Sequence, residues 1–156
     1  MRIAHLTTVP LSLGFLRGHV KYLDSQNVDV HVISSPGEQL DRFAAEHPVT
    51  AHSVAMSRQI SPLADLVSLL RLVVCLRKLR PEVVHAHTPK AGLLGMIAGW
   101  LARVPVRMYH VHGLPLETTT GLKRRLLSIC ERIACHLAHQ VFCVSPSLRQ
   151  AVADYG

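Results

Sequence analysis

Two pairs of histidines are the residues in this sequence whose types and spacing best suit chemistry. His85 and His87 end one apolar segment, and His110 and His112 end another. Because alternate residues of a β-strand point to the same face, each pair would present both imidazoles on one side of a strand. Histidine titrates near neutral pH, so these side chains could act as general bases, hydrogen-bond a substrate hydroxyl or bind a metal ion.

The histidine pairs lie within residues 82–113, a segment that predicts a strand, a tight turn, a helix and a second strand. The strands are expected at residues 83–86 and 106–111, and the helix at residues 89–102. If the strands are parallel neighbours, all four imidazoles gather at the carboxyl edge of the sheet, where open α/β sheets bind ligands. The helix carries small residues that would let it lie close on the sheet: Gly92, Gly95, Ala98, Gly99 and Ala102.

The rest of the chain alternates strands and helices in the same way. Further strands are predicted at residues 2–7, 28–34, 49–56 and 141–144, and further helices at residues 12–27, 38–46, 63–79, 122–138 and after Pro146. The strands are almost continuously apolar, which indicates a mostly parallel sheet covered on both faces. We therefore expect a single α/β domain over residues 1–156, with a Rossmann-like, doubly wound sheet of about six strands in the order 3-2-1-4-5-6 and helices on both faces.

Two helices allow more detailed predictions. Ser12 is placed to cap the first helix, and Asn27 to end it in the left-handed conformation. In the helix at residues 122–138, the spacing predicts a buried apolar stripe of Leu122, Leu126, Ile129 and Ile133. The opposite, polar face of the same helix would consist of Arg125, Ser128, Arg132 and His136.

The composition suits a folded, basic protein. The 156 residues are 49% hydrophobic and 17% charged, which argues against disorder, and the net charge of +7 points to an anionic partner. Aromatic residues make up only 4%, which disfavours the binding of single-stranded nucleic acid by base stacking, so we expect no nucleic-acid partner. The four cysteines form no C-x-x-C pair and are typical of small buried hydrophobes in a reducing compartment.

The sequence is expected to belong to a cytoplasmic protein. No signal peptide is recognisable after Met1, and the longest apolar run, residues 91–102, is shorter than the roughly 20 residues that cross a bilayer. Basic residues cluster in two helical segments: Arg71, Arg77, Lys78 and Arg80 in one, and Lys123, Arg124, Arg125 and Arg132 in the other. These clusters are either solvated surface charge or a surface that docks on anionic lipid at the inner membrane face.

Dinucleotide and metal sites are alternative uses of the same segments. The turn after the first strand lacks G-x-G-x-x-G, and Pro10 obstructs the close approach of a pyrophosphate, which disfavours an NAD site. The H-x-H pattern also occurs in metal-dependent barrel hydrolases, but a barrel needs about 250 residues. A zinc site built from His87, His110 and His112 stays open, whereas His85 is expected to be a hydrogen-bonded structural histidine.

The turns after the two histidine strands predict substrate contacts. Residues 88–90, Thr-Pro-Lys, begin a helix, where free backbone N–H groups and the helix dipole favour an anion. Lys90 adds a positive charge, so a phosphate contact is predicted, the alternative being a solvated lysine. His112 is the predicted catalytic residue, because a histidine there could act as general base towards a hydroxyl. Glu117 would either orient a neighbouring group or cap the next helix.

Three segments resemble a known family. VVHAHTPKAGLLG, VPVRMYHVHGLP and VFCVSPSLR together are similar to the amino-terminal half of a glycosyltransferase family 4 enzyme with the GT-B fold. The nearest similarity is to bacterial enzymes that build capsular, exopolysaccharide or O-antigen repeats. The resemblance covers the whole chain, and HTPKAG and HGLP are its most specific parts.

The resemblance implies two Rossmann-like domains with the active site between them. The amino-terminal domain would mainly bind the acceptor, a polyprenyl-diphosphate-linked saccharide, and the carboxy-terminal domain would hold the nucleotide-sugar donor and a glutamate pair, E-x7-E. Such enzymes retain anomeric configuration and need no metal or other cofactor. The family's histidine near the reacting sugar maps onto His112. Its first turn, glycine-rich in many members, maps onto residues 8–14, where this sequence departs from the glycine pattern.

This chain is not expected to contain a donor domain with such a glutamate pair. It is therefore expected to be the acceptor-binding half of a hexosyl- or N-acetylhexosaminyltransferase, inactive alone and able to form a homodimer through an exposed interdomain face. The alternatives are a stand-alone module that binds an anionic ligand or a membrane without catalysis, and a different Rossmann enzyme such as an oxidoreductase. Besides the catalytic residue His112, the predicted substrate-binding residues are Thr8, Ser12, Gly14, His87, Lys90, His110, Gly113 and Glu117.

Overall fold

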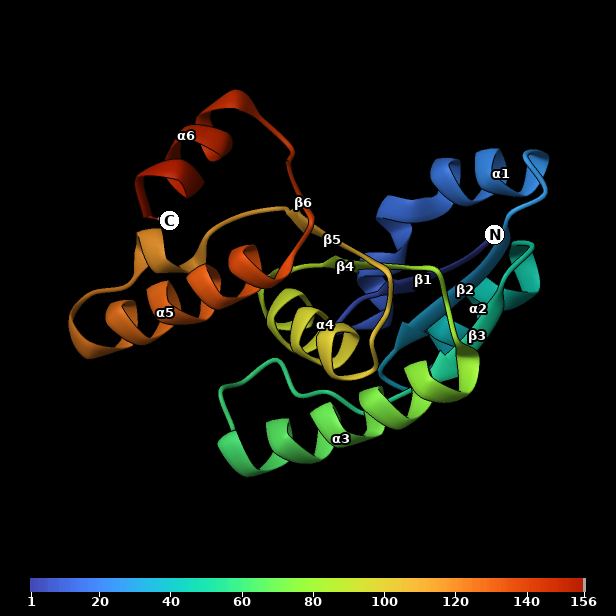
Figure 1. The fold of residues 1–156 in the computed structure, drawn as a ribbon, viewed down its shortest axis with the longest axis horizontal. Helices are drawn as coiled ribbons and strands as arrows, with labels where there is room; N and C mark the ends of the chain where they lie inside the picture. Colours follow the sequence, from blue (N-terminus) through green and yellow to red (C-terminus); the bar gives the residue numbers. More distant parts are fainter. Residues whose placement is uncertain (156) are drawn as a thin grey trace.

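The computed structural model describes residues 1–155, apart from the side chains of Leu116, Glu117 and Tyr155. Strands and helices alternate along the chain, as the sequence predicts (Figure 1). The elements are β1 (Arg2–Leu6), the 3-10 helix η1 (Pro10–Leu16), α1 (Arg17–Ser25), β2 (Asp29–Ser34), α2 (Glu38–Glu46), β3 (Thr50–Ser53), α3 (Pro62–Leu79), β4 (Val83–His87), α4 (Pro89–Leu101), β5 (Val106–Val111), the 3-10 helix η2 (Pro115–Thr118), α5 (Gly121–Leu137), β6 (Gln140–Cys143) and α6 (Pro146–Tyr155).

The six strands form one parallel sheet in the order β3-β2-β1-β4-β5-β6. This confirms the predicted Rossmann-like topology and strand order. In the register of the sheet, His5 of β1 lies beside His85 of β4, and His87 of β4 lies beside His110 of β5. Because all strands run in the same direction, their carboxyl ends, and the turns that follow them, meet at one edge of the sheet.

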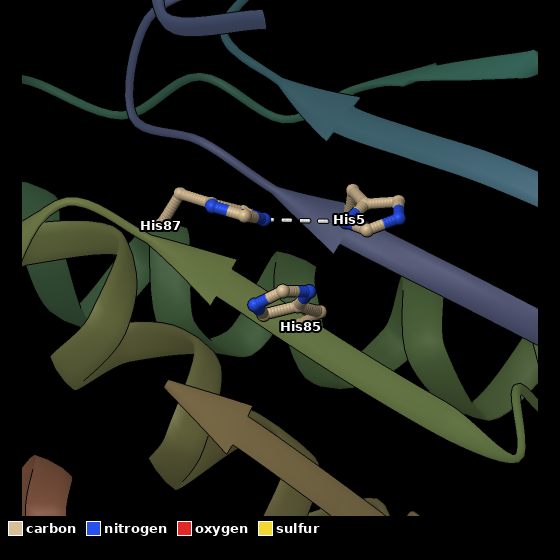
Figure 2. Close-up of side chains that lie close together, drawn as sticks. All are labelled: His5, His85 and His87. Carbon is tan, nitrogen blue, oxygen red and sulfur yellow. Dashed lines mark hydrogen bonds between the residues drawn. The ribbon is translucent and has the colours of Figure 1, made fainter. Parts of the chain in front are cut away.

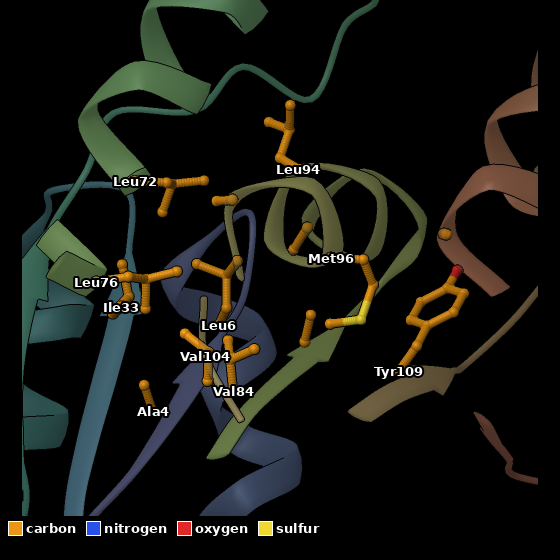
Figure 3. Packing of buried hydrophobic residues seen from close by; sticks show 14 of the residues in the cluster. Ala4, Leu6, Ile33, Leu72, Leu76, Val84, Leu94, Met96, Val104 and Tyr109 are labelled. Atoms are coloured by element: carbon orange, nitrogen blue, oxygen red, sulfur yellow. The ribbon is translucent and has the colours of Figure 1, made fainter. Parts of the chain in front are cut away.

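Helices cover both faces of the sheet (Figure 1). On one face, η1, α1 and α2 pack over a cluster that includes Ile3, Leu16 and Val32. On the other face, α3, α4 and α5 pack over a larger cluster that includes Leu6 and Val84. Figure 3 shows Leu6 and Val84 on the sheet directly beneath α4. Alternate strand residues enter the two clusters, which is the period-two pattern of strands that are buried on both faces.

Helix α4 lies close on the sheet because three of its glycines face the strands. A Cβ at Gly92 would lie 2.2 Å from the ring of Tyr109, and a Cβ at Gly95 would lie 2.5 Å from Leu6. A Cβ at Gly99 would lie 2.9 Å from Val84. The prediction that the small residues serve close packing of helix on sheet is confirmed. This close packing of α4 on the sheet fixes the position of the amino terminus of α4, and therefore the positions of Thr88 and Lys90.

The first helical segment differs from the prediction. Ser12 does not cap an α-helix: it lies inside η1, where its backbone N–H donates to the carbonyl of Val9 at 3.1 Å, and α1 begins only at Arg17. Pro10 accounts for the change, because its fixed φ suits the first position of a helical turn and starts that turn before Ser12. Asn27 does take the left-handed conformation after α1, with φ 56°, as predicted.

The predicted orientation of α5 is wrong. The side chains expected to be buried are exposed, with relative accessibilities of 82%, 45%, 54% and 40% for Leu122, Leu126, Ile129 and Ile133. The face that packs on the domain instead carries the buried Glu131 and Ala134. Leu127, Cys135, Leu137 and Ala138 are partly buried beside them. The helix has apolar residues on two faces, and the face that carries Leu127 and Ala134 is the one that packs against the rest of the domain.

Candidate functional site

The two histidine pairs meet at the carboxyl edge of the sheet, as predicted. The ring centroids of His85 and His87 are 4.1 Å apart, and those of His110 and His112 are 4.5 Å apart. Between the strands, His85 lies 5.6 Å from His110, and His87 lies 5.5 Å from His112. All four rings project from the face of the sheet that η1 and α1 cover.

Two further histidines complete a cluster of six, which we call the histidine cluster: His5, His19, His85, His87, His110 and His112. The ring of His5 lies 5.2 Å from that of His85, and His19 of α1 lies 5.2 Å from His5. Figure 2 shows His5 on β1 beside His85 and His87 on β4. His5 was missed at the sequence level, although the predicted order places β1 next to β4 and its only histidine next to His85.

A chain of hydrogen bonds connects three of these imidazoles. His5 Nδ1 lies 3.2 Å from His87 Nε2, and His87 Nδ1 lies 3.3 Å from His112 Nε2. Since a neutral imidazole has one N–H and one lone pair, each ring can donate to the next along this chain. The chain runs from the fully buried His5 to the half-buried His112 and links the tautomer of His112 to that of His87.

Burial keeps the histidine cluster neutral. Removal from water lowers the pKa of His85 to about 3, with nearby His110, His19 and His112 acting in the same direction. Burial also lowers the pKa of His5 and His87, and to a smaller extent that of His110 and His112. A neutral His112 keeps a lone pair that can accept a proton or a hydrogen bond at neutral pH.

The expectation that His85 is a hydrogen-bonded structural histidine is wrong. His85 is buried, but neither of its ring nitrogens has a hydrogen-bond partner among the described residues. Its neighbours are other imidazoles, including those of His87 and His110. A buried polar group without a partner costs about 1–3 kcal/mol, so the unpaired His85 lowers the stability of the folded domain.

An aromatic side chain covers His112. Phe15 of η1 stacks on the imidazole, with 4.7 Å between the ring centroids and 16° between the planes. Phe15 is 62% exposed, so its outer face is open to a ligand. Sequence reasoning missed this residue, because nothing in its local pattern indicates that η1 folds back over the end of β5.

The turns around the cluster bring together Thr8 and Thr88, whose hydroxyls are hydrogen-bonded at 3.1 Å. Thr88 stands at the start of α4 with φ 75° and ψ 151°, a conformation that costs a non-glycine residue about 1–3 kcal/mol and is found most often at functional sites. No side chain caps α4. The first backbone N–H groups of the helix are therefore not satisfied by a capping side chain, which is the arrangement that favours an anion.

Lys90 is held in an ion pair and is not a freely solvated lysine. Its Nζ lies 2.6 Å from Oδ1 of Asp65 on α3, and the two side chains are only 17% and 21% exposed. The ammonium group also donates to the backbone carbonyl of Gln59. An anion that bound at the start of α4 would have to compete with Asp65 for this charge.

The remaining predicted residues are less constrained. A Cβ at Gly14 or at Gly113 would meet no atom within 4 Å, so packing does not require glycine at either position. Ser12 lies in η1 and is half-buried, and the side chain of Glu117 lies outside the described residues. The structure thus brings Thr8, His87, His110 and His112 to the edge of the sheet without testing which of them touches a substrate.

Two groups of three histidines have metal-ligand spacing in the described part of the chain. One ligand atom from each of His5, His85 and His87 lies within 4.8 Å of the other two, and the same holds for His87, His110 and His112. All three rings of the first group are buried, whereas His110 and His112 of the second are half-buried. Both groups share His87.

Two further features concern the hydropathy of the helices and the state of the cysteines. Within residues 1–155, no helix is both long and apolar enough to cross a membrane. The four cysteines, which all fall in this range, are free and partly buried, and burial raises the pKa of each thiol. Their thiols are therefore protonated at neutral pH and act as small apolar groups, as the sequence predicts.

Comparison with known proteins identifies relatives that match most of the chain. A family model described as a glycosyl transferase 4-like domain matches residues 15–156. The chain is 39% identical over 151 residues to the capsular polysaccharide biosynthesis glycosyltransferase CapM of Staphylococcus aureus, a match that covers 97% of this chain and 39% of that protein. It is 31% identical over 122 residues to the UDP-Gal:alpha-D-GlcNAc-diphosphoundecaprenol alpha-1,3-galactosyltransferase of Escherichia coli, covering 76% of this chain and 32% of that protein.

Solved structures show the same fold. Anabaena HepE, in complex with UDP-glucose, superimposes with a TM-score of 0.69 at 21% sequence identity, covering 100% of this chain and 41% of that one. The apo form of the lipopolysaccharide outer core galactosyltransferase WaaB has a TM-score of 0.69 at 11% identity, covering 100% of this chain and 43% of that one. The chain thus spans less than half the length of the proteins that it matches.

Proposed function

This chain belongs to the glycosyl transferase 4-like family, and from that premise we propose that it is the acceptor-binding, amino-terminal domain of a retaining GT-B glycosyltransferase in surface polysaccharide biosynthesis. The reaction would move a hexose or N-acetylhexosamine from a nucleotide sugar to a lipid-linked saccharide. The proposal treats residues 1–156 as one domain. Donor binding would require a second domain, in keeping with the greater length of the relatives.

The observation that carries the proposal is the neutral, half-buried His112 at the end of the chain His5–His87–His112. If His112 donates its Nε2–H to His87, and His87 donates to His5, then Nδ1 of His112 is left with its lone pair. That nitrogen could accept a hydrogen bond from an acceptor hydroxyl and stabilise the charge that develops as the hydroxyl reacts. The exposed ring face of Phe15, stacked on His112, offers an apolar surface for a sugar ring.

The acceptor proposed for this site is a polyprenyl-diphosphate-linked saccharide. The E. coli relative acts on GlcNAc-diphosphoundecaprenol, and HepE was solved with UDP-glucose, which supports a UDP-sugar as the donor. The diphosphate of the acceptor would lie at the start of α4, where backbone N–H groups and Lys90 favour an anion. Lys90 would then exchange its ion pair with Asp65 for the phosphate.

The exposed stripe of α5 supports contact with an anionic membrane surface. Leu122, Leu126, Ile129 and Ile133 form this stripe, and the exposed Lys123 and Arg125 flank its beginning. The acidic residue of α5, Glu131, is buried, so it does not oppose an anionic surface. Since α5 follows β5, its first turn lies near the same edge of the sheet as the histidine cluster. A peripheral position at the inner membrane face would then bring a lipid-linked acceptor to His112.

The second candidate function, an anionic-ligand or membrane-binding module without catalysis, rests on this same stripe. One experiment separates the two. A short-chain polyprenyl-diphosphate N-acetylglucosamine is titrated into the chain and followed by calorimetry, with His112→Ala as the test variant and His136→Ala, an exposed histidine on α5, as the matched control. Loss of one hydrogen bond predicts binding about tenfold weaker in His112→Ala only.

The possible results of this titration distinguish the two candidate functions. Saturable binding that weakens only in His112→Ala supports the acceptor site. Binding that is indifferent to His112, falls with added salt and follows the anionic lipid content of vesicles would refute it in favour of the membrane module. The chain alone is also expected to show no turnover of a nucleotide sugar, and measurable turnover would overturn the assignment of donor binding to a further domain.

A further inference from the structure

We propose that His87, His110 and His112 form a binding site for a divalent transition-metal ion, with Zn²⁺ as the best fit, at the carboxyl edge of β4 and β5. One ligand nitrogen from each residue lies within 4.8 Å of the other two. Three imidazoles with a fourth position left open form a donor set that Zn²⁺ takes in proteins. The site goes beyond the proposed function, because it needs neither a sugar nor a lipid to form.

The distance between two of the ligands fits a tetrahedral ion. Zinc–nitrogen bonds are about 2.0–2.1 Å long, so two ligand nitrogens on a tetrahedron are about 3.3 Å apart. His87 Nδ1 and His112 Nε2 are 3.3 Å apart. The ring of His110 is stacked on that of His112, with centroids 4.5 Å apart, and its centroid lies 5.4 Å from that of His87. The third imidazole therefore borders the pair, and one nitrogen of each of the three rings lies within 4.8 Å of the other two.

A second contact orients His87, the ligand residue on β4. A metal-bound histidine normally donates its other ring N–H to a nearby acceptor, which fixes the tautomer and the orientation of the ring. Here Nδ1 of His87 would bind the ion, and Nε2 faces His5 Nδ1 at 3.2 Å, as the dashed line in Figure 2 shows. His5 is fully buried and cannot turn towards water, so it holds the ring of His87 in place.

The neighbouring group of His5, His85 and His87 is the poorer site. All three rings are buried, and none of the ring contacts or hydrogen bonds of this group involves a carboxylate. Placing a doubly charged ion there would require its complete desolvation without a compensating charge. In the group of His87, His110 and His112, two rings are half-buried. The open coordination position can therefore be filled by water or by an anionic oxygen.

The test uses the untagged chain, stripped of metal with a chelator. Zn²⁺ is titrated by calorimetry, and Co²⁺ serves as a spectroscopic probe, because tetrahedral cobalt absorbs strongly in the visible range and thiolate ligands would add charge-transfer bands. We expect one ion per chain, a tetrahedral cobalt spectrum without thiolate bands, and affinity at least about tenfold weaker in His87→Ala and in His112→Ala. His5→Ala, which removes the orienting contact but none of the three ligands, is expected to weaken binding about tenfold.

The matched control is His52→Ala. His52 Nε2 lies 2.9 Å from His31 Nδ1, and His31 Nε2 lies 3.0 Å from Asp29, so this is a separate group of imidazoles, here with a carboxylate. Unchanged affinity in His52→Ala supports the proposed site. Absence of binding, affinity lost in His52→Ala, or equal affinity in the parent and His112→Ala would overturn it.

Folding of the variants is checked by circular dichroism. If His87→Ala does not fold, the half-buried His110→Ala takes its place with the same expected loss. Failure of metal binding would leave the lipid-acceptor titration with His112→Ala unaffected, so the two proposals can fail separately.

Discussion

Acidification from pH 8 to pH 5 is expected to lower the free energy of unfolding by about 2 kcal/mol or more, because His5 and His85 are buried as neutral imidazoles. The folded-state pKa of both rings lies below the unfolded value of about 6.5, so the unfolded chain binds more protons. Their stabilising contribution is therefore fully present above pH 6.5 and is lost as the pH falls below it.

The magnitude follows from the distance between pH 5 and the unfolded pKa. At pH 5 an imidazole with an unfolded pKa of about 6.5 favours the unfolded state by about 2 kcal/mol, provided that its folded pKa is well below 5. Burial lowers the pKa of His85 to about 3, and that of His5 well below its usual value. His85 alone thus gives about 2 kcal/mol, and the buried His5 and His87 act in the same direction. Even this one contribution is a substantial fraction of the 5–15 kcal/mol that typically stabilises a domain.

The assay is denaturant unfolding at a series of pH values with a chelator present. His85→Leu is the test variant, because a leucine of similar size fills the site and neither ring nitrogen of His85 has a partner in the described part of the chain. It should reduce the loss of stability between pH 8 and pH 5 by about 2 kcal/mol. His136→Leu, the same change at an exposed position on α5, should leave that loss unchanged.

Two results would refute this reasoning. An unfolding free energy that stays constant between pH 8 and pH 5 would mean that the histidine cluster is hydrated or already charged. An equal loss of stability in His85→Leu and in the parent chain would mean that other groups carry the pH dependence.

Three further changes test the packing, the ion pair and the exposed stripe. Gly92→Ala should lower the unfolding free energy by about 1–3 kcal/mol in denaturant titrations, because its Cβ would lie 2.2 Å from the Tyr109 ring. Gly14→Ala is the control, since a Cβ there meets nothing within 4 Å. Equal effects of the two substitutions would contradict the close approach of α4 to the sheet. A double-mutant cycle of Lys90→Met and Asp65→Asn should give a coupling free energy of about 1–2 kcal/mol. This lies between the values for exposed and buried ion pairs, because both side chains are partly buried. A coupling free energy near zero would contradict the ion pair. Leu126→Asp should reduce sedimentation of the protein with anionic vesicles without lowering its stability, since the side chain is 45% exposed. A large loss of stability would show that the apolar stripe of α5 is covered.

Much of the site could be predicted because it depends on local periodicity and strand order. The spacing of His85 and His87, and of His110 and His112, places each pair on one side of its strand whatever surrounds it. The parallel order then brings the pairs together. Glycines on one side of α4 similarly predicted a close approach to the sheet, since a helix can approach only where side chains are absent.

Contacts made across the fold could not be predicted in this way. Phe15 covers His112 because Pro10 starts a 3-10 helix that carries the chain back over β5, a path that no local pattern describes. Lys90 pairs with Asp65 on another helix, so the alternative of a freely solvated lysine is wrong, while the phosphate contact stays a proposal. These contacts depend on where whole elements pack, not on neighbouring residues.

The sequence by itself determined the alternation of strands and helices, the order of the sheet and the meeting of the histidine pairs, because periodicity defines which side chains share a face. Only the tertiary structure decided which face of α5 is covered and that His5, His19 and Phe15 join the site. The physical reason is that a periodic pattern can carry two apolar faces, as α5 does. The choice between them is made by the shape of the surface that receives the helix, and here that surface accepts Ala134 and leaves Leu126 and Ile129 exposed.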